Sequence, residues 1–328
     1  MNIKQKQAKV LSAYELMAMF PDEQSAINYL ATILWPDGPV CPFCGSQKHN
    51  ARADSSLFCA NCRQSYTIRT NTIFHRSHIP LHKWLYAMYL IITSRKGVSS
   101  LQLSKEVGIT QKSAWFLAQR VRAACGNQTE KILSGIIEID ECYLGGLEKN
   151  KHKHKKLHIG GGHGGKTAIM GMKERGGKVV AKSMPAINFW TVEPVIQTKI
   201  AAGSTVCTDE HGAYKDLSIR YPYAHKTVKH SAKQFVDGMA HTNGIESVWA
   251  VLKRGFYGTY HSFSKKHTDR YVDEFVFRLN EGNCRIDTVN RLSSLVQGTP
   301  GKRLTYRKLT KNADFIRQQI LFDLSETR

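Results

Sequence analysis

Three acidic residues of this chain have the spacing of a shared metal site. Asp140 and Asp209 each end an apolar, strand-like run, and Glu246 lies in an amphipathic helical segment. Carboxylates delivered by two strands and a helix can hold two Mg²⁺ or Mn²⁺ ions about 4 Å apart, because these ions prefer oxygen ligands. Such an ion pair activates an attacking oxygen and stabilises the leaving one. The pattern therefore predicts a two-metal site for phosphoryl transfer.

Further polar residues accompany the third acid. Lys253 follows Glu246 by two helical turns on the same face, where its ammonium could grip a phosphate, and Arg254 comes next. Asn243 lies on that face too and could itself bind a metal. We favour Glu246 as the third ligand because a charged carboxylate binds Mg²⁺ more strongly than an amide does. His211 is either a supporting group of this site or a histidine satisfied within its own turn.

Four of the eight cysteines form two close pairs, Cys41 with Cys44 and Cys59 with Cys62. Without a secretion signal, such pairs indicate metal ligands more than disulfides, with a redox role or chance as the alternative. Four thiolates at this spacing predict one structural Zn²⁺ in tetrahedral coordination, with no open position for chemistry.

The composition indicates a polyanionic partner. The chain of 328 residues has 47 Lys and Arg against 26 Asp and Glu, a net charge of +21. Nucleic acid is the commonest polyanion, and a ribosome-associated or merely basic soluble protein is the alternative. No apolar run approaches 18 residues and the N-terminus is polar, so we expect no membrane association and a cytoplasmic location.

Apolar periodicity and turn residues predict five segments along the chain. They are an N-terminal helical segment (1–36), a zinc ribbon (37–78), a helix-turn-helix-like DNA-binding region (79–127), a mixed-sheet α/β catalytic domain (132–284) and a basic C-terminal tail (285–328).

The DNA-binding region and the catalytic domain each carry a further expectation. In the former, Gln111 and Lys112 open the second helix, the end that meets base edges in such motifs, although a plain helical hairpin explains the pattern nearly as well. In the latter we expect three strands, a helix, a fourth strand and then helices. The basic, glycine-rich stretch 149–166 is either a DNA-contacting loop or an unstructured linker.

The segments around the three acids resemble bacterial insertion-sequence transposases of the DDE type. They read Ile-Ile-Glu-Ile-Asp-Glu, Cys-Thr-Asp-Glu-His-Gly-Ala-Tyr and His-Thr-Asn-Gly-Ile-Glu-Ser-Val-Trp-Ala-Val-Leu-Lys-Arg-Gly-Phe-Tyr-Gly-Thr-Tyr-His. The chain is similar to the group with an N-terminal zinc ribbon, insertion-sequence family fifteen-ninety-five, over about residues 20–285. Some of these relatives are described as having asparagine as the third metal ligand.

The resemblance implies an RNase H-like fold, binding of terminal inverted repeats, and DNA cleavage followed by strand transfer. Asp140, Asp209 and Glu246 would then bind the Mg²⁺ ions. Its partners would be double-stranded DNA of the element ends and the target, at the bacterial nucleoid, with at least a homodimer in the complex. The alternatives are a structure-selective nuclease of the same fold and a non-catalytic DNA-binding regulator, which leaves the three acids unexplained.

Overall fold

The computed structural model describes residues 8–54, 56–126, 132–146, 150, 152–156, 164–215, 217–220, 222–228 and 241–310. The chain forms two compact units. The first comprises Met1–Ile91, Ser100–Ala124 and Asp287–Arg328, and the second comprises Ile92–Ser99 and Cys125–Ile286. Among the helices of the described residues, none has the length and apolar character needed to cross a membrane. Of the basic stretch 149–166, only 150, 152–156 and 164–166 lie within the described residues.

The first unit begins with two short helices and a small sheet. The helices are α1 (Ala13–Met19) and α2 (Glu23–Leu34), and each starts with a capping box in which the side chain before the helix accepts a backbone N–H. The sheet is antiparallel, in the order β1-β2-β3, with strands His49–Ala51, Leu57–Cys59 and Ser65–Tyr66. Cys59 is the last residue of β2, and Cys62 lies between β2 and β3.

Three helices follow, α3 (Leu81–Thr93), α4 (Ser100–Val107) and α5 (Gln111–Cys125). Gly108 turns the chain between α4 and α5 with a φ of +67°, a conformation that favours glycine. The Thr110 hydroxyl accepts the backbone N–H of Ser113 at 3.2 Å and so caps α5. The short helix, turn and longer helix expected here are therefore present.

The interpretation of residues from 285 onward as a tail is wrong for the part that the structure describes. Helices α10 (Thr288–Gln297) and α11 (Tyr306–Thr310) belong to the first unit. Leu292, Leu295 and Val296 of α10 are buried, and the helix packs against α2. The spacing of these three apolar residues is that of one face of a helix.

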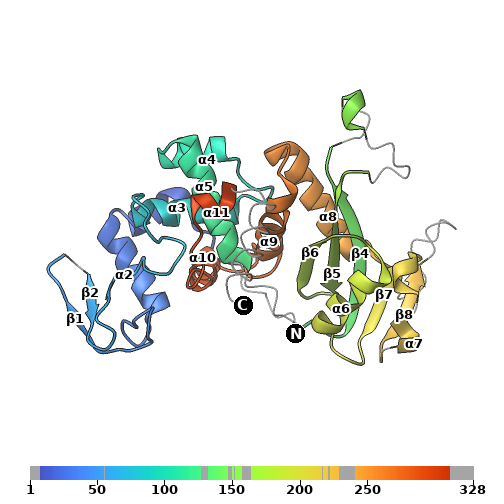
Figure 1. The fold of residues 1–328 in the computed structure, drawn as a ribbon, viewed down its shortest axis with the longest axis horizontal. Helices are drawn as coiled ribbons and strands as arrows, with labels where there is room; N and C mark the ends of the chain where they lie inside the picture. Colours follow the sequence, from blue (N-terminus) through green and yellow to red (C-terminus); the bar gives the residue numbers. More distant parts are fainter. Residues whose placement is uncertain are drawn as a thin grey trace, which may run out of the picture. The chain divides into compact units, whose positions relative to one another are not determined.

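The second unit is built on a five-stranded mixed sheet in the order β6-β5-β4-β7-β8 (Figure 1). The strands are β4 (Ile136–Leu144), β5 (Thr167–Glu174), β6 (Val179–Met184), β7 (Thr205–Asp209) and β8 (Ala224–Val228). The first three are antiparallel neighbours, whereas β7 and β8 run parallel to β4. The sequence predicted all of them except β8, an edge strand whose residues are mostly exposed.

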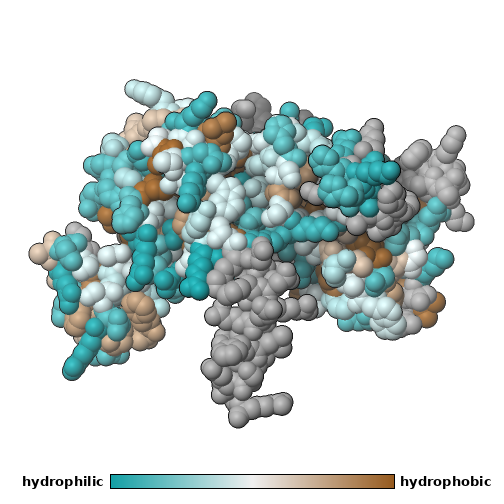
Figure 2. All heavy atoms as spheres, turned by 45° about the horizontal axis from the view of Figure 1, so that its top comes forward, coloured by the Kyte–Doolittle hydropathy of each residue, from teal (hydrophilic) through white to brown (hydrophobic). Residues whose placement is uncertain are grey.

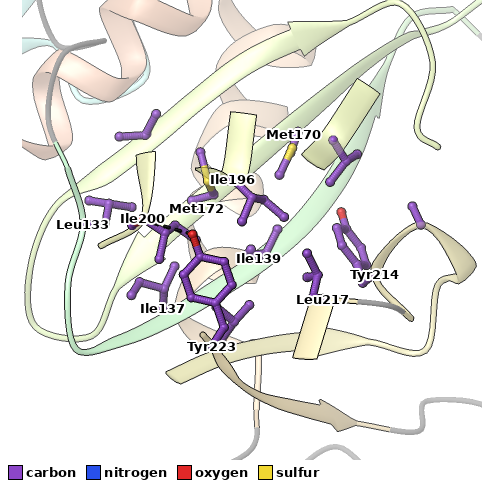
Figure 3. Close-up of a cluster of buried hydrophobic side chains, with 14 of the residues drawn as sticks. Leu133, Ile137, Ile139, Met170, Met172, Ile196, Ile200, Tyr214, Leu217 and Tyr223 are labelled. Carbon is purple, nitrogen blue, oxygen red and sulfur yellow. Dashed lines mark hydrogen bonds between the residues drawn. The ribbon is translucent and has the colours of Figure 1, made fainter. Parts of the chain in front are cut away.

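Each face of this sheet carries its own hydrophobic core. Ile137 and Ile139 of β4 belong to the core that includes α6 (Phe189–Lys199), shown in Figure 3. Cys142 and Leu144 belong to the core beneath α8 (Asn243–Gly255) and α9 (Thr268–Leu279). Because side chains alternate along a strand, the even-numbered residues of β4 face α8.

Hydrophilic side chains cover much of the surface drawn in Figure 2, and the exposed hydrophobic ones form small patches between them.

Candidate functional site

Asp140 lies in the middle of β4, so the expectation that it ends its strand is wrong. The strand continues to Leu144, which pairs with Thr167 of β5. On the other side of β4, the pairing with β7 extends from Ile136 to Glu138. Asp140 thus follows the point where the parallel neighbour stops pairing, which leaves that side of the acid open.

The two strand acids lie on one face of the sheet, and the charge of Asp209 acts on Asp140. Strands β4 and β7 pair as far as Glu138 and Cys207, and each acid lies two residues further along its strand. Burial raises the pKa of Asp140 from 3.8 to about 7, and the negative charges of Glu141 and Asp209 add to the rise.

Trp249 of α8 fixes the position of Asp140. Its indole Nε1–H donates to Oδ2 of Asp140 at 3.0 Å. The residue opposite Asp140 on β5 is Gly171, and a Cβ there would come within 2.4 Å of the Trp249 ring. The glycine therefore makes room for the indole, which fixes one oxygen of the acid, and the backbone N–H of Glu141 also donates to this carboxylate.

Asp209 and His211 are held by the turn that follows β7. Oδ1 of Asp209 accepts the backbone N–H of His211 at 3.0 Å. The His211 Nδ1 in turn accepts the N–H of Ala213 at 3.2 Å and caps the short helix Gly212–Tyr214. His211 also reaches beyond its own turn, because its Nε2 lies 3.9 Å from Oε1 of Glu141 on β4. On the opposite side of β4, the Tyr214 hydroxyl donates to Glu141 at 3.0 Å.

Glu246 and Lys253 project from the same flank of α8. With about 100° between successive residues, Glu246 lies about 60° and Lys253 about 40° around the helix from Trp249. Asn243 lies about 120° away in the same direction. Asn243, Glu246 and Lys253 are exposed, whereas Trp249 is buried. The Glu246 carboxylate accepts a hydrogen bond from the Thr242 hydroxyl at 3.1 Å. Glu246 therefore lies nearer to the Asp140 side of the helix than Asn243 does.

Glu138 holds the start of α8 in place, a role that the sequence did not reveal. Its side chain is 1% exposed, and Oε2 accepts the backbone N–H of Ile245 at 3.0 Å. Oε1 accepts Nε of Arg175 at 2.9 Å, and Arg175 also donates to the carbonyl of His241 at 3.1 Å. Thr242, the residue before the helix, makes no capping bond with its side chain, so Glu138 supplies the cap from β4.

The four paired cysteines meet in one cluster. Their sulfur atoms all lie within 4.8 Å of one another, with Cys41 and Cys62 at 3.6 Å and Cys44 and Cys59 also at 3.6 Å. Zn–S bonds of about 2.3 Å place the sulfurs of a tetrahedral site about 3.8 Å apart, so the cluster fits one zinc ion. Within the described residues, the three acids do not approach one another as closely as these sulfurs do.

Gln111 and Lys112 both lie exposed at the start of α5. Gln111 donates to the Ser100 hydroxyl of α4 at 2.8 Å, and the Lys112 ammonium lies 5.0 Å from the centroid of the Tyr306 ring. Both side chains are therefore accessible and are oriented by neighbouring groups.

Two signals in the sequence could have revealed the residues that the prediction missed. Glu138 is a carboxylate between two isoleucines, on the same face as Asp140, and a buried acid requires a partner. Trp249 follows Glu246 by one helical turn, so its indole had to lie near the acids once α8 was placed on the sheet.

A mixed sheet with two neighbouring acids, covered by a helix that carries a third acid and a lysine, defines a nucleic-acid enzyme of the transposase type. Residues 132–280 match the model of an ISXO2-like transposase domain, and residues 21–65 match that of a transposase zinc-ribbon domain. The chain belongs to the IS1595 family of transposases with an N-terminal zinc ribbon, and its catalytic domain has the RNase H-like fold.

Two relatives are similar over most of their own length. One is an uncharacterized protein in transposable element ISH50 of Halobacterium salinarum, 27% identical over 272 residues, which are 79% of this chain and 91% of that protein. The other is an uncharacterized transposase-like protein of Haemophilus influenzae, 27% identical over 122 residues, 37% of this chain and 96% of that protein.

Proposed function

We propose that this transposase binds the terminal inverted repeats of its element and carries out DNA cleavage and strand transfer at Asp140, Asp209 and Glu246. The observations that support the proposal are the position of Asp140 beneath α8, where it contacts Trp249, and the effect of the Asp209 charge on Asp140. Asp140 has no ion-pair partner among the described residues, whereas Glu138 on the same face has Arg175. An unpaired, largely buried carboxylate next to a second acid is suited to a metal cation.

The carboxylates of Asp140, Asp209 and Glu246 fit two Mg²⁺ or Mn²⁺ ions, because these ions prefer oxygen ligands. The Trp249 indole already fixes one oxygen of Asp140. When bound, the ions supply the Lewis acidity that favours attack at phosphorus. We favour Glu246 over Asn243 as the third ligand, since Glu246 lies nearer to Trp249 around α8.

The chemistry comprises two displacements at phosphorus. A water oxygen forms a bond to phosphorus while the bond to the 3′ oxygen breaks, and the leaving oxygen takes up a proton. The freed 3′-hydroxyl then loses its proton, bonds to a target phosphorus and displaces a target 3′ oxygen. Lys253, exposed on the same flank as Glu246, holds a DNA phosphate near the scissile bond by charge in both steps.

DNA binding is assigned to the zinc ribbon and to the exposed start of α5. The zinc ion would hold the four cysteines and thereby the shape of the ribbon, without taking part in catalysis. Gln111 could read a base edge, while Lys112 and Arg254 contact phosphates. Because two element ends must be brought together, we propose at least a dimer in the DNA complex.

Substitution of the strand acids tests this function. Asp140→Asn and Asp209→Asn should abolish Mg²⁺-dependent cleavage of an element end and leave binding of that end intact. Glu193→Gln, which removes a half-buried carboxylate of α6, is the control and should cleave normally. Normal cleavage by either strand-acid variant would refute the assignment.

A second arm separates transposase from nuclease. Pre-cleaved ends with free 3′-hydroxyls should be joined to target DNA by the wild-type protein. Cleavage without joining would identify a nuclease, and binding with no metal-dependent activity would identify a regulator. Parallel substitution of Glu246 and Asn243 decides the third ligand, since only the ligand variant should lose cleavage.

A further inference from the structure

A basic cleft of about 500 Å³ lies where α8 ends. It is lined by Lys96, Lys253, Arg254, Tyr257, Gly258 and Thr259. We infer that this cleft binds one unstacked nucleotide of a DNA strand, with its phosphate among the three cations and its base against the Tyr257 ring. The inference rests on the proposed function, in which Lys253 holds DNA near the acids.

Two glycines bring Lys96 to the cleft, although it is far from the other lining residues in sequence. A Cβ at Gly255, the last residue of α8, would lie 2.8 Å from the Lys96 carbonyl oxygen. A Cβ at Gly97 would lie 1.9 Å from the Tyr260 hydroxyl, and Gly97 has a φ of +88°. The segment Ile92–Ser99 thus lies directly on the end of α8, and its lysine becomes the third cation.

The other wall of the cleft is also firmly held. Residues Phe256–Tyr260 form a π-helix that continues α8, a rare element that often occurs at functional sites. The Tyr260 hydroxyl donates to Glu274 at 2.7 Å, and Glu274 is paired with Arg278 within α9. This buried pair anchors the π-helix to α9, so the cleft does not depend on a loose loop.

Tyr257 has the exposure expected of a stacking residue. Its side chain is 52% exposed, and its ring packs at 87° against Phe256, with 5.1 Å between the ring centroids. The next residue, Gly258, places no side chain beside the ring. Bases stack on such aromatic rings without regard to sequence, and nearby cations hold the backbone.

The size of the cleft favours a single nucleotide over a duplex. The cleft is open to solvent, and its volume of about 500 Å³ has room for one nucleotide but not for a double helix. Lys253 lies seven residues beyond Glu246, about 10 Å along α8. This distance corresponds to about three base steps of 3.4 Å. The bound nucleotide would therefore lie about three positions from the attacked phosphate.

Fluorescence of 2-aminopurine tests the inference in the full-length protein. The probe is a single-stranded oligonucleotide with one 2-aminopurine, bound without Mg²⁺ so that no cleavage occurs. Stacking on Tyr257 should quench the fluorescence. Tyr257→Leu should lose the quenching and bind about tenfold more weakly, whereas Tyr257→Phe should keep both properties. Trp190→Leu, which removes an exposed aromatic residue of α6, should behave like the wild type.

The salt dependence of oligonucleotide affinity tests whether the cations of the cleft contact a phosphate. Lys96→Ala should lower the slope of log affinity against log salt by about 0.7, the value for one phosphate contact of a single strand. Unchanged quenching in Tyr257→Leu overturns the inference, even if Lys96→Ala weakens binding. The cleft would then contact only the phosphate backbone of the DNA and no base. An unchanged slope in Lys96→Ala overturns the phosphate assignment.

The 2-aminopurine experiment can fail independently of the DNA cleavage assay that tests the proposed function. If the wild type cleaves DNA but Tyr257→Leu retains full quenching, only the nucleotide cleft is refuted. If the wild type does not cleave but Tyr257→Leu loses quenching, the cleft stands and the catalytic proposal fails.

Discussion

Asp140 provides the sharpest test of the site, because replacing it should increase stability while abolishing catalysis. Burial, reinforced by the charges of Glu141 and Asp209, raises its pKa from 3.8 to about 7. Between these two values the folded protein holds a proton that the unfolded chain has released. The free energy of unfolding therefore falls as the pH rises from about 4 to 7, and then stays constant.

The magnitude follows from the two pKa values. At about 1.4 kcal/mol for each pH unit between them, the charged acid costs the folded state about 4 kcal/mol at pH 8. Since the carboxylate keeps some contact with water, we expect about 2–4 kcal/mol. Asparagine retains an oxygen that can accept the Trp249 indole N–H but carries no charge. Asp140→Asn should therefore be more stable than the wild type by about this amount at pH 8.

Thermal unfolding measures the effect. The melting temperature of the second unit should rise by about 4–16 °C at pH 8 in Mg²⁺-free buffer, at about 2–4 °C per kcal/mol for a unit of this size. The difference should shrink toward zero as the pH is lowered to 4. No chelator is used, so that zinc is retained. Equal melting temperatures at pH 8, or a difference that does not change with pH, would contradict the buried-acid explanation.

Three further substitutions test the parts of the molecule that position the site. Cys41→Ser should lose the one zinc ion per chain, which elemental analysis detects against the wild type; a metal-free, fully folded wild type would contradict the zinc assignment. Gly171→Ala places a methyl group within 2.4 Å of the α8 tryptophan and should cost about 1–3 kcal/mol in urea unfolding, whereas Gly146→Ala, with nothing within 4 Å, should cost little. Glu138→Gln leaves Arg175 without its charged partner and should cost about 3–5 kcal/mol, most of which a second substitution, Arg175→Met, should restore.

The sequence predicted the elements whose signal is local. Alternation and turn residues identified β4 to β7, and the hairpin turn between β5 and β6 is closed by the Glu174 N–H to the Lys178 carbonyl at 2.9 Å. The cysteine spacing predicted a cluster that the structure brings together. In each case the determining contacts lie within a few residues or follow from one ligand chemistry.

The failures concern contacts between distant segments. The partner strands of β4 were not predicted: β5 pairs with it up to Leu144, whereas β7 pairs with it only up to Glu138. Helix α10 is stabilised by burial of its apolar face, which composition alone did not distinguish from a basic tail. The approach of Lys96 to the end of α8 depends on two glycines that only the folded chain brings together.

The contrast between Glu138 and Asp140 links the fold to the proposed chemistry. Both acids lie on the face of β4 that contacts α8, two residues apart, and both accept a hydrogen bond from that helix. Glu138 also has Arg175, so its charge is neutralised and it holds the helix in place. Asp140 lacks such a partner among the described residues, so its charge stays costly until a cation arrives. The same strand thus carries one acid that positions α8 and another that is left available for a metal ion.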